Sequence, residues 1–146
     1  MAKKLNIFDR YSHLENRLTH ALGVTLERSP LFKKEFIKAF APAAKSITRK
    51  SRVELQLAKG RSENLTEKTG IPDLVIIDKT DRAIVIESKV GSVLSITQLR
   101  GHENSSRQNN LSIQSALAIT GRDHDRDKVE YAIRNNDISS VWQHVT

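Results

Sequence analysis

The sequence predicts a mixed α/β fold, in which a central β-sheet is flanked by helices on both faces. Two apolar runs, Leu74–Ile77 and Ala83–Ile86, are hydrophobic on both sides, which is typical of strands covered on both faces. Segments with the helical period precede them, and the chain then alternates helix, strand, helix and strand to its end. At 146 residues, a single domain over 1–146 with one core is expected.

The composition excludes several classes of protein. The chain has no cysteine, so disulfides, thiolate metal sites and a cysteine nucleophile are ruled out. With 38% hydrophobic and 28% charged residues, it has the composition of a folded protein. No apolar run reaches the length of a membrane span, and the N-terminus lacks the apolar core of a signal peptide. A cytoplasmic protein without a membrane partner is therefore expected.

Positive charge is concentrated in the first half of the chain. Residues 1–70 carry a formal charge of +8, whereas residues 71–146 carry −1. Four cations follow one another closely in the segment 43–52: Lys45, Arg49, Lys50 and Arg52. Such a cluster favours a nucleic-acid backbone as partner, because neutralising phosphates releases bound counterions. Solubility alone is the competing explanation for this cluster.

The first predicted element is an amphipathic helix over residues 7–26. Its apolar residues recur near one face: Ile7, Tyr11, Leu14, Leu18, Leu22 and Leu26. Glu15 lies about 40° from Tyr11 on this wheel, inside the apolar stripe. A buried carboxylate requires a cation, a hydrogen-bond donor or water beside it, unless Glu15 stands at the edge of the stripe and reaches solvent.

Ser29 and Pro30 predict the start of a second helix, and Pro42 predicts its end. Phe32, Phe36, Ile37 and Phe40 are expected on its inner face, and Lys33, Lys34 and Lys38 in water. The remaining predicted elements are a basic connector at 43–52, a strand at 53–57, a loop at 58–70, strands at 72–78 and 83–89 joined by a turn at 79–82, a helix at 95–109, a strand at 113–120, a helix at 123–135 and a strand at 140–145.

Three ionisable side chains stand at the ends of the two apolar strands. Strand alternation puts Glu87 and Lys89 on one face, and antiparallel pairing brings Asp73 close to them. Pairing Asp78 with Ala83 would set Asp73 opposite Ser88, so a one-residue slip is required. Two carboxylates at this distance repel unless a cation lies between them. Oxygen ligands in a partly open site suit Mg²⁺, and Lys89 is then placed to orient a water or offset phosphate charge.

The pattern Pro72-Asp73, thirteen intervening residues and Glu87-Ser88-Lys89 resembles the signature of the PD-(D/E)XK nuclease superfamily. The resemblance implies a restriction-endonuclease-like core that hydrolyses phosphodiester bonds, with DNA as the expected substrate and Mg²⁺ or Mn²⁺ as cofactor. Asp73 and Glu87 would bind the metal and Lys89 would assist the attacking water. Glu15 matches the helical glutamate that often completes such a site. Gln98 resembles the glutamine on the helix that follows the second strand.

The resemblance further implies an endonuclease that serves as the effector of a bacterial or phage defence system. The chain's last strand, at 140–145, favours the N-terminal part of a longer protein, with a second copy or further domains or subunits as partners. Two other classes stay open. One is an inactive nucleic-acid-binding or assembly module of the same fold, and the other is an interaction domain in which Glu87 and Lys89 form a structural ion pair. The acidic segment 121–127 is interpreted as a helix start and not as a metal cluster.

Overall fold

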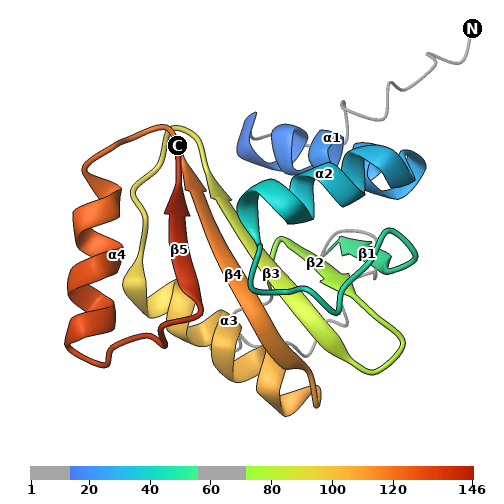
Figure 1. Cartoon of the computed structure of the whole chain (residues 1–146). Helices are drawn as coiled ribbons and strands as arrows, with labels where there is room; N and C mark the ends of the chain where they lie inside the picture. The colour runs from blue at the N-terminus through green and yellow to red at the C-terminus, as the bar shows by residue number, and fades with distance from the viewer. Residues whose placement is uncertain (1–13, 56–71) are drawn as a thin grey trace, which may run out of the picture.

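The structure is a computed structural model that describes residues 14–55 and 72–146, with side chains from residue 17 onward in the first range. It confirms the α/β class: a five-stranded mixed sheet with helices on both faces (Figure 1). In chain order the elements are α1 (Leu14–Arg28), α2 (Pro30–Phe40), β1 (Arg52–Leu55), β2 (Leu74–Ile77), β3 (Arg82–Lys89), α3 (Ile96–Gln108), β4 (Ser112–Thr120), α4 (Asp125–Arg134) and β5 (Trp142–Val145). Residues 7–13, 56–57 and the predicted loop 58–70 lie outside the described residues.

The sheet has the strand order β1-β2-β3-β4-β5, so every strand lies beside its neighbour in sequence. The pairs β1–β2 and β2–β3 are antiparallel, whereas β3–β4 and β4–β5 are parallel. The two parallel connections run through α3 and α4, as parallel neighbours require. The carboxyl ends of β3, β4 and β5 therefore meet at one edge of the sheet, where open α/β sheets commonly bind ligands.

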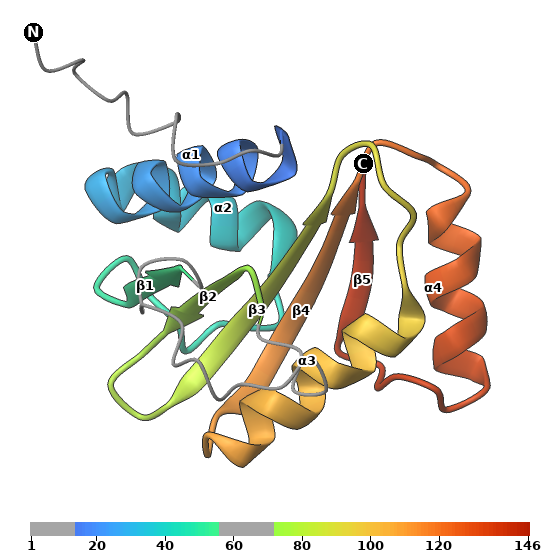
Figure 2. The same cartoon turned by 180° about the vertical axis from the view of Figure 1, so that it is seen from behind.

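Each face of the sheet has its own apolar core. On one face, α1 and α2 pack Leu26, Phe36 and Ile37 against alternate residues of β2 and β3, including Ile76 and Ile84. On the other face, α3 and α4 pack against the intervening residues of β3, β4 and β5. The reverse view shows α3 crossing this second face (Figure 2). Residues that alternate along one strand thus face different helices, and this decides which helix can reach the candidate site.

The buried stripe of α1 differs from the predicted one. Thr19, Gly23 and Leu26 are buried, whereas Leu18 is 44% exposed. The reason is the close approach of β1: a Cβ atom on Gly23 would stand 2.6 Å from Cδ2 of Leu55. A small residue at this position lets the strand touch the helix, and the helix turns Gly23 and Thr19 inward.

Helix α2 begins as predicted, with Ser29 as N-cap accepting a hydrogen bond from the Phe32 backbone at 3.2 Å. Its inner face is narrower than expected. Phe36 is buried, but Phe32 and Phe40 are 41% and 38% exposed and were wrongly placed in the core. The three rings form a row along the helix, with centroids 6.2 and 5.1 Å apart. The outer two rings therefore each contact the buried ring of Phe36.

Lys33 also departs from the prediction, since it is 3% exposed instead of facing water. Its ammonium donates hydrogen bonds to the backbone carbonyls of Arg49, at 3.3 Å, and Ser51. These bonds tie the connector between α2 and β1 to the helix. The helical wheel could not identify this role, because the partners are carbonyl groups in an irregular segment.

Replacing Lys33 by Met should lower the free energy of unfolding by about 1–3 kcal/mol, because two carbonyls lose a charged donor. Methionine keeps the length of the side chain, so packing changes little. Lys34→Met, at the exposed neighbouring position, is the matched control and should change stability by less than about 0.5 kcal/mol. Urea unfolding of both variants measures the difference, and equal effects would contradict the anchoring role of Lys33.

Candidate metal and phosphodiester site

The structure brings Asp73 and Glu87 together through the register of β2 and β3. Leu74 pairs with Ile86, and Ile77 pairs with Ala83. Continuing this register by one residue sets Asp73 opposite Glu87, which is the one-residue slip that the sequence required. A hydrogen bond from the Ser88 amide to Oδ2 of Asp73, at 3.3 Å, holds the aspartate beside the strand. Both carboxylates lie on the face of the sheet that α3 covers.

Glu87 is the most buried charged side chain of this site, with no exposed surface. Its Oε2 accepts a hydrogen bond of 2.6 Å from Nε2 of His102 on α3. Its Oε1 lies 3.3 Å from Nζ of Lys89, which is itself mostly buried. Each oxygen thus faces one basic group, and this compensates for the loss of hydration.

The surroundings of Asp73 destabilise the charged form of its carboxylate. Burial, and next to it the charge of Glu87, raise the pKa of Asp73 from 3.8 to about 7, while the Ser88 amide opposes this shift. A carboxylate in this position competes with its neighbour for positive charge. The site consequently favours either a proton on Asp73 or a cation near both carboxylates.

Two further predicted site residues, Gln98 and Glu15, lie in the first turns of α3 and α1. Gln98 is half-buried in the first turn of α3 and lies one helical turn before His102, on the same side of the helix. Glu15 lies in the first turn of α1, and its side chain is outside the described part of the chain. Helix α1 covers the opposite face of the sheet from α3. The carboxyl end of β3 points toward α1 in both views (Figures 1 and 2).

His102 was not among the predicted site residues. It is 1% exposed, on the inner side of α3 beside the core residue Leu99. The available signal was a polar residue three positions after Leu99, on a stripe that should be apolar. Its partner Glu87 is fifteen positions away in another element, so the sequence alone did not connect the two.

Polar side chains also lie at the carboxyl ends of β4 and β5, next to the end of β3. Glu87 lies beside Ala118 of β4, and Ala118 lies beside His144 of β5. Lys89 lies beside Thr120, whose hydroxyl is hydrogen-bonded to Nε2 of His144 at 2.7 Å. Burial lowers the pKa of His144, with Asp125 opposing that shift. The edge formed by the carboxyl ends of β3, β4 and β5 is therefore polar, whereas the middle of the same face is apolar.

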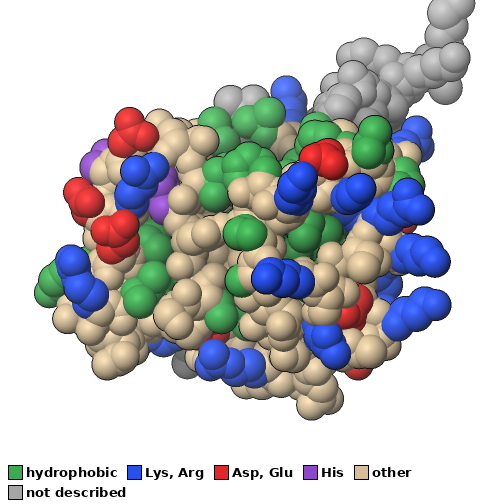
Figure 3. Space-filling model, viewed as in Figure 1, with side chains coloured by type: hydrophobic (Ala, Val, Ile, Leu, Met, Phe, Trp, Pro, Cys, Tyr) green, Lys and Arg blue, Asp and Glu red, His purple; other side chains and the backbone are tan. Residues whose placement is uncertain are grey.

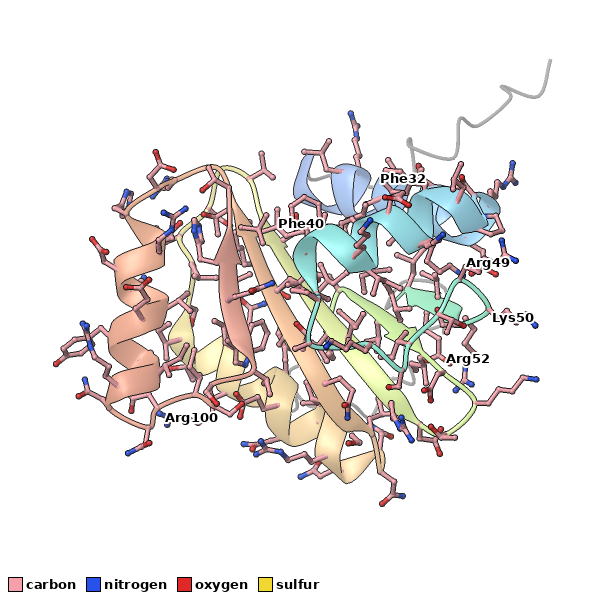
Figure 4. All side chains as sticks on the ribbon, viewed as in Figure 1. Phe32, Phe40, Arg49, Lys50, Arg52 and Arg100 are labelled. Carbon is pink, nitrogen blue, oxygen red and sulfur yellow. The ribbon has the colours of Figure 1, made fainter. Side chains whose placement is uncertain are left out.

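The predicted nucleic-acid-binding cations lie elsewhere. Lys45, Arg49 and Lys50 belong to the connector whose Ala44 and Ile47 pack on the α1–α2 face. Arg52 starts β1, pairs with Ile77 and bonds Glu54 at 3.1 Å. Figure 4 shows Arg49, Lys50 and Arg52 along the β1 side of the molecule, pointing outward. The structure does not bring these four residues together with Asp73 and Glu87.

The acidic segment before α4 is a helix start, as predicted. Asp125 and Asp127 stand in the first turn of α4, where the helix dipole favours negative charge. The N-cap position is His124, whose side chain makes no capping hydrogen bond. The acidic residues therefore act here through the dipole and not as an N-cap.

The donor set at Asp73 and Glu87 fits a hard divalent cation. Both ligands are carboxylates, which Mg²⁺ and Mn²⁺ prefer, and the raised pKa of Asp73 shows that negative charge there is not fully compensated. Among the side chains that the structure describes, no group of three or more His, Asp or Glu is arranged to hold a metal. The fit thus rests on the two carboxylates alone, with Glu15 as the predicted third ligand.

Comparison with protein-family models, curated proteins and solved structures finds no match to this chain. Within the described residues, no helix is both long enough and apolar enough to cross a membrane. The function therefore has to be inferred from the site itself.

Proposed function

We propose that this chain is a metal-dependent nuclease of the PD-(D/E)XK type that hydrolyses phosphodiester bonds, most suitably in DNA. The observation that carries the proposal is the convergence of Asp73, Glu87 and Lys89 at the end of β3. The α/β fold, with a carboxylate-bearing hairpin followed by a helical crossover, is compatible with a restriction-endonuclease-like core.

In this proposal Asp73 and Glu87 hold the cation, with Glu15 completing the set from α1. When bound, Mg²⁺ or Mn²⁺ supplies positive charge that stabilises the charge developing on the attacked phosphate. Lys89 orients the attacking water and donates to a phosphate oxygen. His102 fixes the orientation of Glu87, as partners of metal-binding carboxylates commonly do. Gln98, in the first turn of α3, contacts the substrate backbone in this proposal.

The direct test is plasmid cleavage with Mg²⁺ or Mn²⁺, compared with the same reaction in EDTA. Wild type should nick or linearise the plasmid, and Lys89→Ala should lower the rate by about 10²-fold or more. Lys79→Ala is the matched control, because Lys79 is an exposed lysine in the β2–β3 turn. Cleavage that persists unchanged in Lys89→Ala would refute the proposal.

One observation favours the second candidate, an inactive nucleic-acid-binding or assembly module. Both oxygens of Glu87 already face basic groups, His102 and Lys89, so the glutamate is compensated without a metal. Calorimetric titration with Mg²⁺ separates the two candidates. Salt-dependent DNA binding without a Mg²⁺ heat and without cleavage would support the inactive module.

Two of the four connector cations, Lys50 and Arg52, fit this proposal as a contact remote from the scissile bond. They point outward along the β1 side of the molecule (Figure 4), away from Asp73 and Glu87, so only a long substrate can reach both places. Lys50→Ala with Arg52→Ala should weaken binding of a long duplex and lower the slope of its logarithmic salt dependence by about two. Binding of an eight-base-pair duplex should not change. Gel-shift titrations at several salt concentrations measure both, and equal losses would contradict the remote contact.

A further inference from the structure

A groove with an apolar floor lies on the α1–α2 face of the sheet. It has a volume of about 650 Å³ and is formed between the second half of α2 and the connector. This size is within the range of about 300–1,000 Å³ that is common for ligand sites. The candidate nuclease site lies on the other face, so the groove is a separate feature.

Two kinds of residue line this groove, and they occupy different places. Ile37, Ala41, Ala44 and Ile47, each at most 6% exposed, close the bottom of the groove, and the exposed ring of Pro42 completes this aliphatic floor. Four cations stand exposed at the rim: Lys34, Lys38, Lys45 and Arg49. No lining residue is acidic or aromatic. Figure 3 shows Lys and Arg side chains gathered over α2 and the connector, with hydrophobic surface between them.

Each wall of the groove carries two of the four cations. Lys34 and Lys38 are one turn apart on α2, about 6 Å along its axis. Lys45 and Arg49 are also four residues apart, on the connector wall. A ligand that lies in the groove can therefore place apolar groups on the floor and acidic groups against either wall.

The connector wall is held in place before any ligand arrives. Successive turns are closed by backbone bonds from Ala44 to Ala41, at 2.9 Å, and from Ile47 to Ala44, at 3.0 Å. The buried ammonium of Lys33 then fastens the far end of the wall to α2. A preformed groove spends little of its binding free energy on ordering.

We propose that this groove binds an acidic amphipathic segment of a partner protein. Aliphatic anchors of the segment pack on the floor, and its Asp or Glu side chains pair with the four rim cations. A nucleic acid is less suited, because unpaired bases bind chiefly by stacking on aromatic rings and a duplex backbone offers nothing to an aliphatic floor. Lys50 and Arg52 lie outside the groove and stay accessible to a nucleic acid.

The test is selection of a random twelve-residue peptide library displayed on phage against the whole chain. The double variant Lys34→Glu, Lys38→Glu serves for counter-selection, since both residues are exposed on a helix and should not disturb folding. Enriched peptides should be acidic and carry two apolar residues three or four positions apart. In fluorescence anisotropy they should bind wild type at least about tenfold more tightly than the double variant.

The matched control is Lys50→Glu with Lys79→Glu, which changes the charge equally at exposed positions outside the groove. This control should lower affinity by less than about threefold, through long-range electrostatics only. Failure to enrich acidic peptides, or equal affinity for the double variant, would overturn the proposal. An oligothymidylate that displaces the peptides and loses affinity in the double variant would also overturn it, in favour of nucleic acid. Circular dichroism confirms that each variant is folded.

Discussion

Replacing Asp73 by Asn should abolish plasmid cleavage and, at the same time, make the metal-free protein more stable above pH 7. Cleavage should fall by about 10²-fold or more, because the proposed cation loses one of its two carboxylates. The free energy of unfolding should rise by roughly 1–4 kcal/mol at pH 8. A catalytic carboxylate is expected to lower the stability of the folded protein, because catalysis requires charge in a place where burial makes it unfavourable.

The sign of the stability change follows from the pKa of Asp73. Burial and the neighbouring Glu87 raise this pKa from 3.8 to about 7. The folded protein therefore keeps a proton on Asp73 that the unfolded chain releases between about pH 4 and pH 7. This contribution to stability is fully present below pH 4 and is lost as the pH rises through 7. Asparagine is neutral at every pH and can still accept the Ser88 amide bond, so the loss disappears.

Urea unfolding from pH 4 to pH 8, in EDTA, measures this prediction. Wild type should lose stability over the range relative to Asp73→Asn, and the two curves should converge near pH 4. Asp81→Asn is the matched control, because Asp81 is exposed in the β2–β3 turn at a φ of 59°, which asparagine adopts readily. Parallel curves for wild type and Asp73→Asn would show that Asp73 is not held near Glu87.

Replacing His102 by Ala should destabilise the protein by about 3 kcal/mol, because Glu87 would keep its charge in the core with one partner fewer. The cost should be partly relieved by Glu87→Gln in the same chain, since the neutral amide does not require a basic neighbour. The double variant should therefore be more stable than the sum of the single changes predicts, by about 1–3 kcal/mol.

A double-mutant cycle with His102→Ala, Glu87→Gln and both changes measures this coupling by urea unfolding at pH 7. His124→Ala is the control, because the His124 side chain is 72% exposed and its loss should cost less than about 0.5 kcal/mol. Additive effects of the two changes would mean that the 2.6 Å contact between His102 and Glu87 contributes no coupling.

The sequence predicted the α/β class and the order of elements because hydrophobic periodicity is a local signal. Apolar runs on both sides of β2 and β3 identified central strands, and Ser29 with Pro30 located the start of α2. The pairing of Asp73 with Glu87 was predicted only by adding a one-residue slip to the register of the two strands. The apolar pattern does not reveal the turn geometry that fixes this register.

Contacts between distant segments were beyond this reasoning. Lys33 was assigned to water because nothing in its own helix reveals the carbonyls of Arg49 and Ser51. His102 was passed over because its partner belongs to another element. The connector cations were assigned to the substrate by charge alone, and charge does not tell which face of a sheet a segment covers. Side-chain roles that depend on tertiary contacts thus need the structure.

The turn between β2 and β3 also bears on the order in which the protein assembles. This hairpin closes over a short stretch, with the Asp78 carboxylate accepting bonds from the Thr80 and Arg82 amides. Local contacts of this kind form early, whereas the parallel pairing of β3 with β4 must wait for α3 to cross the sheet. We therefore expect Asp73 and Glu87 to come face to face before His102 docks. On this pathway the Asp73 and Glu87 carboxylates already lie close together in the hairpin. His102 reaches Glu87 only when α3 docks on the sheet.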